Sequence, residues 1–364
     1  MNRSESVPHA VPRTVFVLAL LALGAGCREQ QTTLPVAERG SPTVYVSDEN
    51  TGLLWAIDAS TDSVIARVPV GKRPRGVHVS ADGKTVFLAV SGAPKGGPGV
   101  DESKLPPPDL SADGVAMVDA VAHQLIERLP GGLDPESFDL TKSGKTLFVS
   151  NENGASLSFI DVESQRVVQR VPVGAEPEGV TLSPDGSEVW VTSETEGAVY
   201  VVDARTGRKL AVIDVGNRPR SVAFLPDGSR AYVPAEMDGT VSVVDTRTHR
   251  VLKTIQIPGE GARPMGTVVS PDGSRLFVSN GRGGTVSVID TGSGEVVKTI
   301  ATGGRPWGLA LTPDGRKLYT ANGPAGDVAV IDVASGTVVK RIETGGSPWG
   351  VAIRRGSASA GGDR

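Results

Sequence analysis

The chain has 364 residues, enough for one large domain or two of ordinary size. Hydrophobic residues make up 38% and charged residues 21%, and the 46 glycines and 26 prolines favour a turn-rich all-β chain over a helical one. The net charge of −4 argues against broad, sequence-independent nucleic-acid binding, which needs a basic surface, and the single cysteine excludes an intrachain disulfide.

Residues 1–27 are expected to be an export signal. Arg3 and Arg13 give a basic start, and residues 15–25 form an apolar run too short to span a bilayer but typical of a signal-peptide core. The run ends at Cys27, and the small residues before it resemble the lipobox of bacterial lipoproteins, in which the cysteine is lipidated. This resemblance implies a protein anchored on the periplasmic side of a bacterial membrane, for example the outer membrane, or at the cell surface, through the tether 28–42. An ordinary secretory signal with a chance cysteine is the alternative.

Seven internal repeats follow over residues 43–355. An aromatic residue recurs once per repeat, at Tyr45, Phe87, Phe148, Trp190, Tyr232, Phe277 and Tyr319. Most intervals are about 42 residues long, and each unit has four short Val/Ile/Leu-rich stretches separated by turn residues, such as 179–183, 188–193, 197–203 and 209–215. This pattern predicts an all-β, seven-bladed β-propeller built from four-stranded antiparallel blades.

The two ends of the repeat region are complementary. It begins with the second strand of a unit, near 44–46, and finishes with the first strand of a unit, at 350–353. We therefore expect the C-terminal strand to complete the N-terminal blade and close the ring, which removes open sheet edges and favours a monomer. Residues 356–364 are expected to be a disordered tail.

The polar turn after the second strand carries a family resemblance. The segments 148–151 (FVSN), 277–280 (FVSN) and 318–322 (LYTAN) resemble the YVTN-type β-propeller repeat, a WD40-like unit. The order of motifs is similar to that of the β-propeller proteins associated with PQQ-dependent alcohol catabolism, on RPRG (73–76), DPE (134–136), SNE (150–152), EPEG (176–179), TSET (192–195), RPR (218–220) and PWG (348–350). The resemblance implies an exported propeller linked to PQQ-dependent alcohol oxidation.

Loops before the first strand and after the second strand of each unit should share one face, which we call the top face. Charged and aromatic residues in these loops are the candidate residues for binding a ligand or partner: Arg73, Arg75, Glu136, Glu152, Glu178, Glu194, Arg220, Glu236, Arg263, Arg305, Trp307 and Trp349. Opposed charges of this kind can orient a partner, or they can simply neutralise one another as exposed pairs. The two tryptophans could form an aromatic platform or pack against the next loop.

An insertion of about 19 residues near 92–112 extends one top-face loop, and its Gly and Pro content predicts no regular structure there. It could cover the channel mouth, contact a partner or be disordered. His78 and Asp139 hold equivalent positions in neighbouring units, where a structural hydrogen bond is favoured over an acid–base pair. The four histidines are scattered, so no metal site and no cofactor are predicted from their spacing.

These features favour a periplasmic binding or scaffold module, with a protein partner or small ligand at the top face, over an enzyme. No catalytic residue is assigned. The alternative is a lactonase-like hydrolase or lyase that uses Glu152, Glu194, Glu236 or His78 with a divalent metal. A redox protein is a third hypothesis, although the haem motif Cys-x-x-Cys-His is absent from the sequence.

Overall fold

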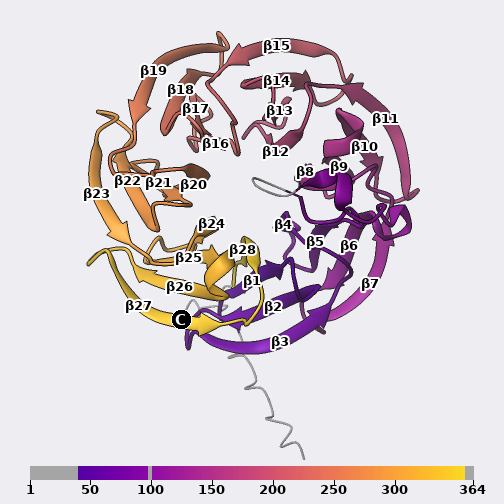
Figure 1. Cartoon of the computed structure of the whole chain (residues 1–364), viewed down its shortest axis with the longest axis horizontal. Helices are drawn as coiled ribbons and strands as arrows, with labels where there is room; N and C mark the ends of the chain where they lie inside the picture. The colour runs from indigo at the N-terminus through magenta and orange to yellow at the C-terminus, as the bar shows by residue number, and fades with distance from the viewer. Residues whose placement is uncertain (1–39, 97–100, 357–364) are drawn as a thin grey trace, which may run out of the picture. The chain divides into compact units, whose positions relative to one another are not determined.

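The computed structural model describes residues 40–96 and 101–356, which form seven four-stranded antiparallel sheets arranged in a ring (Figure 1). The predicted seven-bladed, all-β fold is confirmed. The expected export signal, Cys27, most of the tether and the tail from 357 onward lie outside the described residues. Among the described residues, no helix is long and apolar enough to cross a membrane.

The blades follow one another around the ring in chain order. From the channel outward, the closing blade contains β28 (Pro348–Arg354), β1 (Thr43–Asp48), β2 (Leu53–Asp58) and β3 (Ser63–Pro69). The next contains β4 (Val77–Val79), β5 (Thr85–Val90), β6 (Gly114–Asp119) and β7 (Gln124–Leu129). The third contains β8 (Pro135–Leu140), β9 (Thr146–Asn151), β10 (Ser156–Asp161) and β11 (Arg166–Pro172).

The other four blades repeat this plan. They contain β12 (Pro177–Leu182), β13 (Glu188–Ser193), β14 (Ala198–Asp203) and β15 (Lys209–Asp214); β16 (Ala223–Phe224), β17 (Arg230–Ala235), β18 (Thr240–Asp245) and β19 (Arg250–Gln256); β20 (Pro264–Val269), β21 (Arg275–Asn280), β22 (Thr285–Asp290) and β23 (Val296–Ala301); and β24 (Pro306–Leu311), β25 (Lys317–Asn322), β26 (Asp327–Asp332) and β27 (Thr337–Glu343).

The hydrophobic core lies between neighbouring blades rather than within one. The second and third strands of a blade are buried on both faces, which explains why their sequences are nearly continuous apolar runs, such as β5 and β13. One cluster joins Tyr45 and Leu54 of the closing blade to Val86 and Leu88 of the next. The outermost strands are largely exposed, as in β19, where six of the seven residues face solvent. Each blade therefore depends on its neighbours for burial.

The ring is closed by strand pairing between the two ends of the repeat region. Strand β28 pairs antiparallel with β1, with Tyr45 opposite Ala352 and Val44 opposite Ile353. Figure 1 shows this contact as the yellow strand beside the indigo one. The expected completion of the N-terminal blade by the C-terminal strand is confirmed.

The turns between the first and second strands are built by aspartate and glycine. Asp185 accepts hydrogen bonds from the Ser187 amide (3.0 Å) and the Ser183 hydroxyl (2.6 Å), while Gly186 adopts a φ of +80°, which a residue with a Cβ rarely takes. The aspartates that end the third strands act similarly: Asp203 accepts from the Thr206 amide at 2.7 Å. These aspartates therefore hold the turns through hydrogen bonds from backbone amides.

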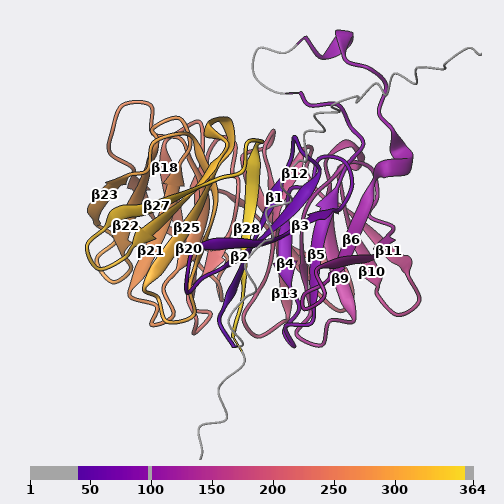
Figure 2. The same cartoon turned by 90° about the horizontal axis from the view of Figure 1, so that it is seen from below.

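The insertion differs from its expected lack of regular structure. Its described part contains two single-turn 3₁₀ helices, η1 (Glu102–Lys104) and η2 (Leu110–Ala112). The second is capped by Asp109, whose side chain accepts from the Ser111 amide at 3.2 Å, and Asp109 also pairs with Lys72 at 2.8 Å. Local capping by a short polar side chain therefore forms helical turns despite the surrounding prolines. Figure 2 shows the insertion extending beyond the strand ends on one side of the ring.

Ring closure gives a direct test by truncation. A chain that ends at Ser347 lacks β28 and leaves the inner edge of β1 unpaired, so we expect aggregation or higher oligomers in size-exclusion chromatography. A chain that ends at Gly356 keeps every described strand and should elute as the full-length protein does. Equal behaviour of the two truncated chains would contradict the closing role of β28.

Candidate functional site

Top-face loops enclose a cavity of about 1250 Å³ at the mouth of the channel. All twelve candidate residues line it except Glu136, which lies beneath the surface, and Arg263. Arg263 instead donates to the backbone carbonyl oxygens of Glu236 (3.3 Å) and Met237 (2.8 Å). Ten of the twelve candidate residues therefore line the cavity, and Glu136 and Arg263 do not.

A repeated loop conformation positions the charged side chains. The residue before the proline of the loop has a positive φ in four consecutive blades, at Arg73 (+42°), Asp134 (+53°), Glu176 (+50°) and Arg218 (+61°). Residues other than glycine rarely adopt this backbone conformation. They keep it where the surrounding structure holds them in place, often at functional sites. The same conformation recurs in four turns between outer strands, at Asp62, His123, Gln165 and His249, so it is a turn feature that fixes the direction of these loops.

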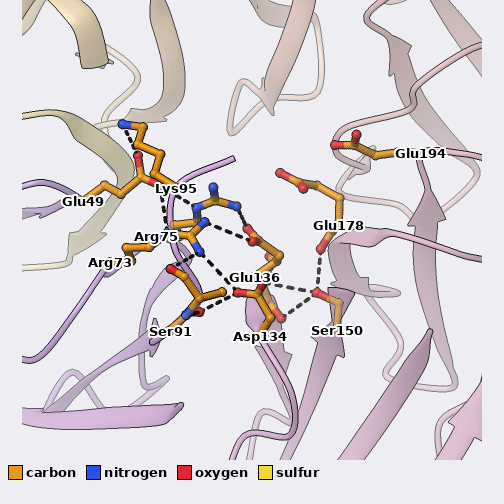
Figure 3. A network of polar contacts seen from close by, with 12 residues as sticks. Glu49, Arg73, Arg75, Ser91, Lys95, Asp134, Glu136, Ser150, Glu178 and Glu194 are labelled. Carbon is orange, nitrogen blue, oxygen red and sulfur yellow. Dashed lines mark hydrogen bonds and ion pairs between the residues drawn. The ribbon is translucent and has the colours of Figure 1, made fainter. Parts of the chain in front are cut away.

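The first charged cluster lies between the closing blade and the third blade (Figure 3). The Arg75 guanidinium is 3.0 Å from Glu49 and also pairs closely with Glu136, while Arg73 is 3.4 Å from Glu49 and 3.8 Å from Glu136. Lys95, from the insertion, is 2.7 Å from Glu49. Burial alone would raise the pKa of Glu49, but Arg75 and Lys95 outweigh burial and lower this pKa to about 2.

The second cluster repeats the arrangement three blades further along the chain. Arg220 contacts Glu178 at 3.1 Å and pairs closely with Glu194, and its Nε atom is 3.7 Å from Glu236. Arg218 is 2.6 Å from Glu194 and 3.6 Å from Glu236. The side chain of Arg220 is only 7% exposed. Each arginine joins carboxylates from more than one loop.

The charges therefore neutralise one another, as one of the two hypotheses expected, but they do so as buried pairs and not as exposed ones. The side chains of Glu49, Glu136 and Glu236 are 0%, 1% and 6% exposed. Exposed pairs contribute about 0–1 kcal/mol, whereas removing one partner of a buried pair leaves an uncompensated charge and costs about 3–5 kcal/mol. The clusters thus hold the inner loops of neighbouring blades together.

Three carboxylates converge where this pairing is incomplete. Asp134, Glu136 and Glu152 each place an oxygen within 4.8 Å of the others. Among the described residues, no cation lies within ion-pair distance of Glu152. Burial and the neighbouring Glu136 raise the pKa of Glu152 to about 9, so its carboxyl group holds a proton at neutral pH. Burial also raises the pKa of Asp134, which accepts from the Ser91 hydroxyl at 2.5 Å.

The same three carboxylates could hold a divalent cation such as Ca²⁺ or Mg²⁺, which prefer oxygen ligands. Glu152 holds a proton and shares a hydrogen bond with Glu136, so a cation bound by this donor set would take the place of that proton. The divalent-metal hypothesis named Glu152, Glu194, Glu236 and His78. Of these, only Glu152 belongs to this group.

The aromatic residues combine the two expected arrangements. Trp307 and Trp349 contact each other with ring centroids 4.1 Å apart, and the Arg75 guanidinium lies 4.6 Å from the Trp349 ring. Trp307 is mostly buried and packs against Gly323, where an added Cβ would come within 2.2 Å of the indole ring. Trp349 is partly exposed to the cavity. Packing thus fixes Trp307, and Trp349 presents the accessible aromatic surface.

The favoured hydrogen bond between His78 and Asp139 is not formed. The nearest His78 and Asp139 atoms are 3.7 Å apart, and Asp139 instead accepts from the backbone amides of Leu140 (2.7 Å) and Leu182 (2.8 Å). The bond to Leu182 crosses to the next blade. Backbone amides satisfy this carboxylate, and neither His78 nor Asp139 lines the cavity.

Sequence reasoning missed Lys95 and gave no site role to Asp134. Lys95 lies in the insertion, whose residues 93–96 and 105–108 contribute to the cavity wall. Nothing in the composition of that loop distinguishes Lys95 from Lys104, which pairs within the insertion with Asp101 at 2.8 Å. Asp134 could have been found from its place before the loop proline, equivalent to that of Arg73.

Comparisons with known proteins agree with the fold. Residues 179–346, less than half of the chain, match the family described as "Lactonase, 7-bladed beta-propeller". No curated protein matches the chain. Similar solved structures include hydrazine synthase from Kuenenia stuttgartiensis (22% identity, TM-score 0.65), covering 77% of this chain and 89% of that one.

Two further structures are similar. A dihydro-heme d1 dehydrogenase, NirN, in complex with DHE is 17% identical with a TM-score of 0.62, covering 87% of this chain and 76% of that one. A protein of unknown function from Desulfotomaculum acetoxidans is 16% identical with a TM-score of 0.71, covering 86% of this chain and 99% of that one. At these identities the similarity establishes a shared β-propeller fold.

Removing one buried arginine should destabilise the ring. We expect Arg220→Leu to lower the free energy of unfolding by about 3–5 kcal/mol, because Glu178 would stay buried without its cation and Glu194 would keep only Arg218. Denaturant titration measures this change. The matched control Arg316→Leu removes an exposed arginine 3.9 Å from Asp314 and should stay within about 0.5 kcal/mol of wild type. Similar losses in the two variants would contradict the buried-pair interpretation.

The raised pKa of Glu152 predicts how stability depends on pH. Because the pKa rises from 4.5 to about 9 on folding, the folded state binds this proton more tightly, and stability is lost as the pH rises from about 4.5 through 9. Glu152→Gln cannot lose a proton there, so its free energy of unfolding should decrease less than that of wild type over this range. Urea titrations at several pH values compare the two proteins. Parallel profiles would exclude a raised pKa at Glu152.

Proposed function

We propose that this propeller is a lactonase-like hydrolase that binds a small polar molecule in the top-face cavity and opens a cyclic ester. The observation that carries the proposal is the convergence of Asp134, Glu136 and Glu152 beside the cavity, where Glu152 is protonated and, among the described residues, has no cation within ion-pair distance. Environments that push the pKa values of neighbouring carboxyl groups apart commonly separate an acid from a base. Burial tends to raise the pKa of Glu136, but Arg75 outweighs burial and lowers this pKa. The pKa of the neighbouring Glu152 is raised instead.

The residues can be given roles in ester hydrolysis. The carboxylate of Asp134 takes a proton from a water molecule, whose oxygen bonds to the ester carbonyl carbon. Arginines of the cavity wall, such as Arg73, stabilise the negative charge that develops on the carbonyl oxygen. The ring carbon–oxygen bond then breaks, and Glu152 donates its proton to the leaving oxygen. The product is the hydroxy acid, and exchange with solvent restores the two proton positions.

A divalent cation is a second way to neutralise the same carboxylates. If bound by Asp134, Glu136 and Glu152, it would polarise the ester carbonyl as a Lewis acid. The chain's own residues would then act as ligands, and Arg73 and Arg75 would still hold Glu136 in place. Activity that is lost on treatment with EDTA and restored by added Ca²⁺ or Mg²⁺ distinguishes this form from the metal-free one.

The partial match to the lactonase family supports a hydrolase more than a scaffold. Burial of the charged residues points the same way, since a flat protein surface could not reach Glu49 or Glu136, whereas a small molecule fits a cavity of about 1250 Å³. The lipid-anchored periplasmic scaffold linked to PQQ-dependent alcohol oxidation remains a prediction.

Glu152→Gln tests the proposal. With glucono-δ-lactone as substrate and correction for spontaneous hydrolysis, we expect kcat to fall by about 10²–10⁴-fold, because the amide cannot donate the acid proton. Wild-type activity should decrease as the pH rises through about 9, where Glu152 loses its proton. Acid release in a pH-stat measures both effects.

The control is Glu295→Gln, which removes an exposed carboxylate away from the cavity and should leave kcat unchanged. Several lactones of different ring size should be tested before activity is judged absent. A wild-type protein that hydrolyses none of them, or a Glu152→Gln variant as active as wild type, would overturn the proposed hydrolase.

A further inference from the structure

One arginine of the cavity differs from the rest in its partners. Among the described residues, Arg73, Arg75, Arg218 and Arg220 each pair with at least two carboxylates, but Arg305 forms neither an ion pair nor a hydrogen bond. Its Nε atom is buried and has no acceptor. A guanidinium group carries five donors and stays charged, so an arginine without an acceptor at a cavity wall is a candidate anion-binding residue.

The surroundings of Arg305 are positively charged, as Arg305 is itself. Burial lowers the pKa of Arg305, Arg282 and Arg220 lower it further, and Glu236 is the acidic group that opposes them. The Arg305 guanidinium lies 5.6 Å from the centre of the Trp307 ring, and Lys95 lies 6.0 Å from the same ring. This part of the wall therefore presents positive charge against an aromatic surface.

Trp307 adds a second donor in the same place. Its indole Nε1 atom is also buried and has no acceptor. Trp349, 4.1 Å away by ring centroids, extends the aromatic surface toward the cavity. Two neighbouring side chains with unused N–H donors indicate that this wall is suited to an acceptor with negative charge, whereas another part of the wall carries the carboxyl groups of Asp134 and Glu152.

We propose that Arg305 and Trp307 form a subsite for the anionic group of a small organic molecule, either a carboxylate or a phosphate. The subsite deepens the proposed hydrolase and rests on it for the identity of the substrate, because it requires the bound molecule to carry an acidic group at a distance from the bond that reacts. Arg305 is a binding residue in this arrangement, and Trp307 holds its guanidinium at the wall through cation–π contact.

Binding without turnover tests the subsite. Isothermal titration calorimetry at low ionic strength compares gluconate, glucose 6-phosphate and uncharged glucose. We expect at least one of the two anions to bind about tenfold or more tightly than glucose, and the tighter anion identifies the preferred group. Arg305→Gln should remove this preference while leaving the weak affinity for glucose unchanged, and Arg305→Lys should keep part of it.

The matched control is Arg282→Gln. This variant removes an exposed positive charge close enough to influence Arg305 but outside the cavity wall, so it should bind the anions as wild type does. If anion binding is weakened equally in Arg305→Gln and Arg282→Gln, a general electrostatic effect explains it and the subsite is refuted. If wild type shows no preference for either anion over glucose up to about 10 mM, the subsite is also refuted. Anion binding that persists in Glu152→Gln, together with no lactone hydrolysis by wild type, would refute the hydrolase and leave the subsite standing.

Discussion

The inner end of the ring depends on burying arginine and carboxylate together. Arg75 lies in the loop before β4, yet its partners come from the loop after β1 and from β8, so one guanidinium connects three blades. Neither charge could be buried alone, because removal from water costs several kcal/mol per ion unless a partner compensates it. The cavity therefore keeps its shape only while these pairs remain intact.

Two ionisable residues of the cavity lack a partner of opposite charge among the described residues, and these two residues define what the cavity can bind. Within residues 40–96 and 101–356, Glu152, which follows β9, has no cation within ion-pair distance, and Arg305, which precedes β24, has no carboxylate within that distance. Two blades, the closing blade and the one that follows it, separate them on one side of the ring (Figure 1). A polar molecule placed between them would meet a proton donor at one end and a positive charge at the other.

The repeat pattern predicted the fold because each strand and turn is specified by residues close together in the sequence. Recurring aromatics such as Trp190 and turns such as that at Asp185 and Gly186 each specify a strand or a turn within a few residues. The complementary ends near Val44 and Ile353 then predicted closure. Even the face that carries the site followed from strand direction alone.

Burial and pairing in the site could not be predicted in the same way. Whether Arg220 meets Glu178, Glu194 or solvent depends on the distance between neighbouring blades, which the repeat length does not specify. The pKa of Glu152, in the loop after β9, likewise depends on Glu136, which lies 16 positions away in the sequence on β8. The contact of Lys95 with Glu49 required the path of the insertion, whose sequence has no repeat to guide it.

The pairing of β28 with β1 also imposes an order of events on the newly made chain. Residues such as Val44 and Ile353 are about 300 positions apart, so the N-terminal blade cannot acquire its innermost strand until almost all of the protein has been synthesised. Contacts this distant in sequence form slowly, since a long loop must be closed before they contribute. During that interval the first three strands present an open edge, and a chaperone that shields β1 would protect the protein when it is most prone to misassembly.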